Sequence, residues 1–262
     1  MPDGRESTAT DPHGGPDPAY QRIRQYLSDQ IAAGTIAPGS RLSAERTLAE
    51  QLGVSRVTLR RSLQQLVADG LVTPSRGRGW FVTPDPLSEP PNVLLSFTDM
   101  ATSAGKTARA ELLARVVEPA TPDQAAALGL RPGAATIVLE RLRLIDDFPM
   151  AVIRSRLPLA RFRALAKADL TDVSLYRLLR ERYGVIPTES DFQVEARPAE
   201  TRIADLLGIE AAGPVLTVRQ QTRDQHGTPV ELADTHYRAD RYRFRATVRS
   251  NDAGSGPIAM SD

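Results

Sequence analysis

The sequence predicts an α+β protein of two domains: a small helical domain that ends in a hairpin, and a larger domain of antiparallel strands and short helices. Three observations predict this class. Apolar residues recur at helical spacing in the first part of the 262-residue chain and alternate as in strands in the second. The run TPDPLSEPP at 83–91 separates the two parts, because prolines do not continue a helix or a central strand. Positive charge is concentrated before this run.

The charge distribution indicates that the two domains have different partners. Residues 20–82 hold nine arginines against four carboxylates, although the net charge of the whole chain is only +1. A compact basic segment joined to a more acidic one is typical of a polyanion-binding module attached to another domain. The chain contains no cysteine, which excludes a disulfide scaffold, thiol catalysis and cysteine-ligated metals. No apolar run is long enough to cross a bilayer and no signal-peptide pattern is present, so we expect a cytoplasmic protein.

Composition also places the domain boundaries. Residues 1–18 and 251–262 have little to bury and predict a disordered arm and tail. We place the first domain at 19–83, the linker at 84–93 and the second domain at 94–250.

The first domain is predicted to contain three helices. Apolar residues follow helical spacing from Tyr20 to Ile31, and two further helices follow. We expect Ser43 to cap the second helix and Ser55 to cap the third, because a serine oxygen can accept from the free N–H groups of a first turn. Gly70 suits the end of the third helix, where a left-handed residue is common.

The second and third helices have the pattern of a helix–turn–helix. Ala49, Gly53 and Leu59 stand at the spacing that lets two helices cross around a tight turn. Arginines and hydroxyls at the start of the third helix and on a following hairpin loop, the wing, are groups that bind base edges and phosphates. These candidate residues are Ser55, Arg56, Thr58, Arg60, Arg61, Arg76 and Arg78. Because Arg60 and Arg61 are adjacent, only one of them is expected to face a groove.

The second domain contains a weak internal repeat. Residues 127–158 resemble residues 206–238, and in each copy a helix ends at a glycine, Gly129 or Gly208, before two strands joined by a polar turn. This order predicts a duplicated helix–hairpin unit in a pseudo-twofold antiparallel sheet. An amphipathic helix is predicted at 173–183, between the copies.

Two pairs of polar residues in the second domain predict a ligand site. Arg141 and Arg143 alternate on a predicted strand and therefore project from one face, where two guanidinium groups can bind a phosphate or a carboxylate. Glu231 and Tyr237 also share one side of a strand and offer an acceptor and a hydroxyl. The alternative interpretation is that the paired arginines form a solvated outer face of the sheet.

Residues 20–82 resemble the winged helix–turn–helix of the GntR family of bacterial transcription regulators. The resemblance is carried by PG before RL, by AER, LAEQLGVSR, T-x-R and DGL, and by G-R-G-x-F-V in the wing. It implies operator contacts by Arg46, Arg56, Thr58, Arg60 and Gly77, and favours Arg60 over Arg61. Val57 stands at a position where the family frequently has a threonine, and this difference implies a changed base preference or a lost phosphate contact. Ser43 replaces a common proline.

Residues 97–250 resemble the UTRA effector-binding domain of the HutC subfamily, which has a chorismate-lyase-like fold. The matching segments are FTDM, ERLRL, SLY, PVE and YRADRYRF. In regulators of this type that bind amino-sugar phosphates, the resemblance places the following residues in the pocket: Phe97, Thr98, Arg141, Arg143, Ser174, Glu231 and Tyr237. Ser174 is alternatively a plain helix cap. Ile153 and Arg156 depart from the family pattern on the first hairpin and allow a more anionic ligand.

These features predict a homodimeric transcription regulator, associated with the bacterial nucleoid and without a cofactor or metal. We expect a repressor that small anionic metabolites, such as sugar phosphates, phosphonates or carboxylates, release from a palindromic double-stranded DNA operator. Two alternatives are a lyase-like enzyme domain fused to a DNA-binding domain and a ligand-independent DNA-binding protein. The sequence contains no nucleophile–base pair or phosphate loop, so we do not expect an enzyme.

Overall fold

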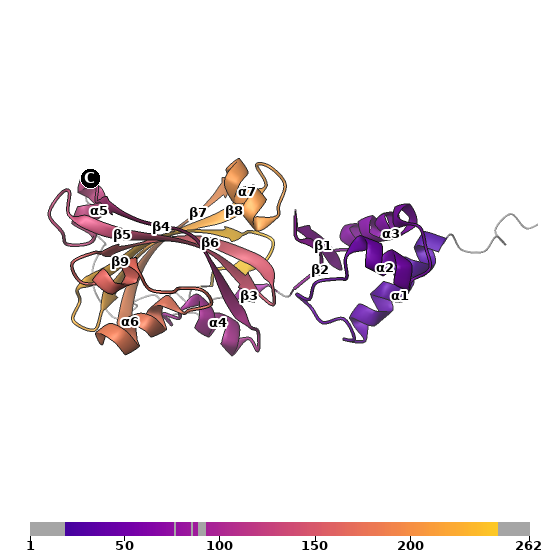
Figure 1. Cartoon of the computed structure of the whole chain (residues 1–262), viewed down its shortest axis with the longest axis horizontal. Coiled ribbons are helices and arrows are strands. Elements are labelled where there is room, and N and C mark those ends of the chain that lie inside the picture. Colours follow the sequence, from indigo (N-terminus) through magenta and orange to yellow (C-terminus); the bar gives the residue numbers. More distant parts are fainter. Residues whose placement is uncertain (1–18, 76, 85, 89–92, 246–262) are drawn as a thin grey trace, which may run out of the picture.

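The computed structural model describes residues 19–75, 77–84, 86–88 and 93–245. Two domains follow one another along the long axis of the molecule, a helical domain and a larger domain built on one curved sheet (Figure 1). The predicted arm at 1–18 and tail at 251–262 lie outside the described residues.

The first domain is a three-helix bundle with a two-stranded wing. Its elements are α1 (Ala19–Ala32), α2 (Glu45–Gln51), α3 (Arg56–Ala68), β1 (Val72–Ser75) and β2 (Gly79–Val82). Its core is formed by apolar side chains of all three helices, including the fully buried Leu59, Leu63 and Leu66 of α3. Gly53 has a φ of 64°, which favours glycine in the turn between α2 and α3.

One of the two predicted helix caps is confirmed. The side chain of Ser55 accepts a hydrogen bond from the backbone N–H of Thr58 at 3.1 Å and caps α3. The prediction for Ser43 is wrong, because α2 begins one residue later than expected and its N-cap position is Ala44, which has no side-chain acceptor. The first turn of α2 instead carries the acidic side chain of Glu45.

The proline-rich segment between the domains contains one short strand. β3 (Leu87–Ser88) pairs in parallel with β10 (Tyr242–Arg243), close to the last described residue. The linker is therefore fastened to the second domain at this point. The pairing agrees with the expectation that this segment would not form a central strand, since it lies outside the main sheet.

The second domain is organised around a six-stranded antiparallel sheet with the strand order β4-β5-β6-β9-β8-β7. The strands are β4 (Ala108–Pro119), β5 (Ala135–Ile145), β6 (Phe148–Pro158), β7 (Pro187–Pro198), β8 (Pro214–Asp224) and β9 (Pro229–Arg238). The helices are α4 (Phe97–Ser103), α5 (Pro122–Ala127), α6 (Leu175–Tyr183) and α7 (Thr201–Leu207), with a 3-10 turn, η1, at Arg163–Ala166.

The strand order confirms the predicted duplication. α5 and α7 are each followed by a left-handed glycine, Gly129 and Gly208 with φ of 61° and 65°, and then by a hairpin, β5–β6 or β8–β9. The two hairpins meet at the centre of the sheet, where β6 pairs with β9. The repeat also includes the edge strands β4 and β7, which precede α5 and α7 and which sequence comparison did not reveal.

The two faces of the sheet are covered differently. α4 and α6 lie on one face, below the sheet in Figure 1, while α5 and α7 lie on the other at opposite ends. Apolar residues of α4 and α6 pack with the odd-numbered positions of β5, such as Ile137 and Leu139. α7 packs instead against Leu142 and Leu144. The pocket that contains the predicted ligand residues lies on the face of α4 and α6.

The wing packs against the second domain. The ring of Phe81 in β2 meets the edge of Phe148 with 5.4 Å between the ring centroids. The backbone of Ser75 lies so close to Gly208 that an added Cβ there would be 2.9 Å from the serine Cα. A hydrogen bond of 3.0 Å from Arg241 to Thr73 joins the same surfaces. The first domain therefore has a defined position relative to the sheet.

Candidate functional sites: a helix–wing surface and an enclosed pocket

The exposed face of α3 carries the side chains predicted to bind DNA. Ser55 fixes the start of the helix, and its hydroxyl also lies 2.8 Å from that of Thr58. Arg56 and Arg60, one turn apart, are exposed, and between them Val57 is 81% exposed. Such a surface offers cationic donors and one apolar contact. We call the exposed face of α3 together with the wing the helix–wing surface.

Arg60 and Arg61 point to different partners, as their spacing predicted. The guanidinium of Arg61 lies over the ring of Tyr20 in α1, 4.0 Å from its centroid. Arg60 instead donates from Nη2 to Oε2 of Glu45 at 2.7 Å. This contact leaves Arg60 on the outer surface between α2 and α3.

Glu45, which lies within the segment AER, is a further residue of this surface. Its second oxygen, Oε1, accepts a 3.0 Å hydrogen bond from the indole N–H of Trp80 in the wing. Arg56 lies 3.9 Å away. The hydrogen bonds from Arg60 and Trp80 lower the pKa of Glu45, so its carboxylate is ionised near neutral pH. Sequence spacing contained no sign of this arrangement, because Glu45, Arg60 and Trp80 come from three separate elements.

Of the remaining predicted DNA-binding residues, Arg46 and Gly77 lie at the edges of the helix–wing surface. Arg46 is exposed on α2. Gly77 is exposed in the wing and has a φ of 73°, which favours glycine. Arg78 turns toward the second domain and donates both terminal nitrogens to Glu111 of β4, at 3.1 and 2.8 Å. Arg76 lies outside the described residues.

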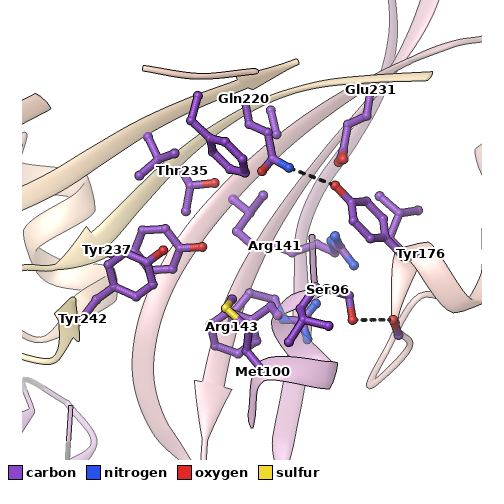
Figure 2. Close-up of a pocket in the computed structure, with 18 residues that line it drawn as sticks. Ser96, Met100, Arg141, Arg143, Tyr176, Gln220, Glu231, Thr235, Tyr237 and Tyr242 are labelled. Atoms are coloured by element: carbon purple, nitrogen blue, oxygen red, sulfur yellow. Dashed lines mark hydrogen bonds between the residues drawn. The ribbon is translucent and has the colours of Figure 1, made fainter. Parts of the chain in front are cut away.

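An enclosed pocket lies between the sheet, α4 and α6 (Figure 2). Arg141 and Arg143 both line it, each only 3% exposed, so the interpretation as a solvated outer face is wrong. Arg141 donates from Nη1 to the carbonyl of Val173 at 3.4 Å, and Arg143 donates from Nη2 to the hydroxyl of Thr98 at 2.9 Å. The Nε–H groups of both arginines are buried, and neither has a hydrogen-bond partner among the described residues.

The charged side chains that line the pocket favour an anionic ligand. Burial lowers the pKa of Arg141 and of Arg143, because removal from water destabilises their positive charges. Glu231 lines the same pocket, and burial raises its pKa despite the attraction of Arg141. Burial therefore disfavours the ionised form of Glu231. Two buried cations with unused donors are an arrangement that a bound phosphate or carboxylate would stabilise.

A hydrogen-bonded group of side chains forms the other end of the pocket. Gln220 donates to the hydroxyl of Tyr176 at 3.1 Å and to the hydroxyl of Ser190 at 2.8 Å. The hydroxyl of Tyr176 also lies 3.1 Å from that of Thr222. Tyr176 and Gln220 both line the pocket, but the sequence analysis did not name them as site residues. Tyr176 is the last residue of the matched segment SLY, whereas no local sequence signal indicated Gln220.

The other predicted ligand residues gather around the pocket with one exception. Phe97 lines it, and Arg143 lies over its ring at 4.6 Å. Thr98 is not a lining residue and reaches the site only through its hydrogen bond to Arg143. Tyr237 lines the pocket and stacks on Tyr242 with 3.7 Å between ring centroids.

Ser174 has both of the roles that were considered for it. Its hydroxyl accepts from the backbone N–H of Arg177 at 3.4 Å and caps α6, and the residue also lines the pocket.

The two departures from the family pattern differ in position. Ile153 lines the pocket, whereas Arg156 lies on the opposite face of the sheet and pairs with Glu118 at 2.6 Å. Only the departure at Ile153 therefore alters the pocket wall.

Two further features of the described residues bear on the kind of protein. Among the residues that the structure places, no group of three or more His, Asp or Glu side chains is arranged to hold a metal ion. In the same ranges, no helix has the length and apolar character needed to span a membrane.

A winged helix–turn–helix joined to a domain with an enclosed polar pocket defines the class of DNA-binding transcription regulators. Two family models match the chain: "Bacterial regulatory proteins, gntR family" at residues 19–82, and "UTRA domain" at residues 103–243. The chain belongs to the GntR family of regulators that carry a UTRA domain. It is a regulator and not an enzyme, because both domains match regulator families and its curated relatives are named as regulators.

Similar proteins support the same classification. The chain is 36% identical to the HTH-type transcriptional repressor NagR of Bacillus subtilis over 87% of this chain and 94% of that protein. It is 28% identical to the HTH-type transcriptional regulator Rv0792c of Mycobacterium tuberculosis over 92% of this chain and 90% of that protein. The crystal structure of PhnF from Mycobacterium smegmatis is 29% identical and superposes with a TM-score of 0.61, covering 87% of this chain and 100% of that chain.

Proposed function

We propose that this protein is a cytoplasmic, homodimeric repressor that binds a palindromic operator and releases it when a small anionic metabolite enters the pocket. NagR, a similar protein over most of both chains, is named as a repressor. Two copies of one helix–turn–helix related by a twofold axis read a twofold-symmetric site, which is why the operator is expected to be a palindrome.

The proposed DNA contacts are divided between base reading and phosphate binding. Arg56 and Arg60 supply guanidinium groups from the exposed face of α3, the helix that enters the major groove in this motif. Ser55 and Thr58 hold the start of α3 with hydroxyls that can also donate to phosphates. We also assign Arg46, Gly77 and the two wing arginines, Arg76 and Arg78, to the phosphate backbone of the duplex. Arg78 can bind a phosphate only after it is released from Glu111.

The pocket is the observation that carries the proposed effector class. The Nε–H donors of Arg141 and Arg143 are buried and have no partner in the part of the chain that the structure describes. A dianion bound between the two guanidinium groups would satisfy those donors and compensate both charges. Glu231 and Tyr176, at the other end, suit the hydroxyl or amino groups of a sugar or a similar polar body. We therefore propose a sugar phosphate, a phosphonate or a carboxylate as the effector.

A continuous set of contacts joins the pocket to the DNA-binding domain. Tyr242 lines the pocket, stacks on Tyr237 and belongs to β10, which pairs with the linker strand β3. A ligand that binds better to one arrangement of this strand pair than to another shifts the position of the first domain. Release of DNA follows only if the two arrangements differ in effector affinity.

The test combines operator selection with a ligand screen. A random duplex library would be selected with the full chain, and the enriched site used in mobility-shift titrations. A thermal-shift screen would compare phosphosugars, phosphonates, carboxylates and amino acids. We expect a twofold-symmetric site, and a stabilising anion that also weakens operator binding. Absence of any enriched sequence would refute the DNA-binding assignment. Stabilisation only by uncharged compounds would refute the effector class.

A further inference from the structure

Glu45 joins three elements of the helix–wing surface. It is the first residue of α2, and its two oxygens have different partners: Oε2 accepts from Arg60 of α3 at 2.7 Å, and Oε1 accepts from Trp80 of β2 at 3.0 Å. Its side chain is 19% exposed, whereas that of Arg60 is 55% exposed. A largely buried carboxylate thus holds an exposed guanidinium beside the wing.

This contact restricts Arg60 without using all of its donors. An arginine side chain on a helix surface has many rotamers, and it loses that freedom when it binds a base edge. The hydrogen bond to Glu45 orders the side chain before DNA arrives. Because a guanidinium has five N–H donors and the Glu45 contact uses one nitrogen, the remaining donors stay available for a bidentate contact with a base.

The same carboxylate weakens attraction to DNA in general. Glu45 places a negative charge 2.7 Å from Arg60 and 3.9 Å from Arg56, in the surface that would face the phosphates. Sequence-independent binding depends on uncompensated cations, so Glu45 reduces it. Glu45 therefore has opposite effects on affinity for any duplex and on discrimination between duplexes.

We propose that Glu45 is a positioning residue that sets the base preference of the recognition helix by fixing Arg60 against Trp80. This inference rests on the proposed DNA-binding function and deepens it. Glu45 acts through Arg60, because Oε2 is bound to that guanidinium and Oε1 is bound to the indole of Trp80.

The test compares Glu45→Gln with Glu50→Gln in the full-length protein. Glutamine keeps the size of the side chain but removes its charge, and Glu50 is an exposed glutamate on the same helix, which makes it a matched control. Each protein would be titrated with the selected operator, with operators changed at one base pair at a time, and with an unrelated duplex. We expect Glu45→Gln to lose roughly tenfold in discrimination at the position read by Arg60. Its affinity for the unrelated duplex should stay the same or rise, and Glu50→Gln should keep the discrimination of the unmodified protein.

A double-variant experiment separates positioning from direct contact. In an Arg60→Ala background, Glu45→Gln should cause no further loss of discrimination at any base pair. A further loss at another base pair would mean that Glu45 reads that base itself and would overturn the proposal. Unchanged discrimination in the single Glu45→Gln variant would overturn it as well. Failure of the unmodified protein to select any sequence would instead refute the DNA-binding function, so the two failures are distinguishable.

Trp80 supplies an independent variant and a direct readout. Trp80→Phe removes the indole N–H that holds Oε1 of Glu45 and should reduce discrimination at the same base pair as Glu45→Gln. Trp80 is also the single tryptophan of the chain, so tryptophan fluorescence reports on the surroundings of this side chain alone. Its emission should change in Glu45→Gln and not in Glu50→Gln. An identical emission spectrum in the unmodified protein, Glu45→Gln and Glu50→Gln would show that the charge of Glu45 does not act on Trp80 in solution and would overturn the proposal.

Discussion

Arg78 of the wing and Glu111 of β4 form a two-hydrogen-bond ion pair, with distances of 3.1 and 2.8 Å, across the boundary between the two domains. A wing arginine that is held in this way is not free to bind a phosphate. DNA and Glu111 therefore compete for the same guanidinium group, and the position of the wing on the sheet affects operator binding.

Substitution of Glu111 should strengthen DNA binding. Glu111→Gln removes the competing charge, and because the pair is partly exposed, we expect a rise of about two- to fivefold in operator affinity. Fluorescence anisotropy with a labelled operator measures this change. Glu195→Gln is the matched control, since Glu195 pairs with Arg197 on β7 and not with the wing. A lower affinity of Glu111→Gln would show that the ion pair supports the DNA-binding arrangement.

Gly208 tests the close contact between the wing and the sheet. A Cβ at Gly208 would clash with the hydroxyl oxygen of Ser75 and lie 2.9 Å from its Cα, whereas the nearest described atom to a Cβ at the equivalent Gly129 would be 3.9 Å away. Both residues are left-handed, so alanine costs about 1–2 kcal/mol at either position from backbone strain alone. Gly208→Ala should therefore lower the free energy of unfolding more than Gly129→Ala does, and only Gly208→Ala should alter operator affinity. Equal effects in urea unfolding and DNA titrations would contradict the docked position of the wing.

Arg60→Ala should remove sequence preference. The variant loses the guanidinium that is placed on the outer face of α3 and should bind the operator at least roughly tenfold more weakly, while its affinity for an unrelated duplex falls much less. Parallel titrations with the operator and the unrelated duplex measure the ratio of the two affinities. Arg61→Ala is the control, because Arg61 contacts Tyr20. Full operator affinity in Arg60→Ala would refute its role as a base reader.

Arg141→Ala should separate operator binding from the response to the effector. Arg141 is buried in the pocket and belongs to the second domain, so we expect unchanged operator affinity but loss of the effector's thermal stabilisation and of operator release. Thermal melts with and without the effector, followed by mobility shifts, measure both properties. Arg154→Ala, on the opposite face of the sheet, is the matched control. An unchanged response to the effector would remove Arg141 from the site.

Asp224 should make the free energy of unfolding depend on pH in the acidic range. Burial opposes ionisation of this residue, but hydrogen bonds from Arg161 and from the backbone N–H groups of His226 and Thr228 hold its pKa below the ordinary value. The unfolded chain therefore binds a proton more readily than the folded chain. The contribution of Asp224 to the free energy of unfolding is complete above about pH 4. It is lost as the pH falls through the pKa of Asp224 in the folded protein. Asp224→Ala should lower the free energy of unfolding by about 2 kcal/mol at pH 7. In denaturant melts, the difference from the unmodified protein should shrink below pH 4, and a constant difference would contradict this assignment.

The sequence by itself determined the features that depend on near neighbours in the chain. Helical spacing and a serine cap located α3, and strand alternation placed Arg141 and Arg143 on one face of β5. The repeat around Gly129 and Gly208 predicted the paired hairpins of the sheet. Each of these signals lies within a few residues or within one element, where backbone geometry fixes the relative directions of side chains.

The tertiary structure decided which side chains from distant elements meet. Glu45 lies beside Arg60 and Trp80, Arg78 is held by Glu111, and Gln220 completes the pocket opposite the arginines. Local pattern also failed at Ser43, where a start of α2 shifted by one residue moved the serine away from the cap position. Such contacts depend on how the helices cross and how the wing docks on the sheet. Packing of the whole chain sets those arrangements, and no local spacing encodes them.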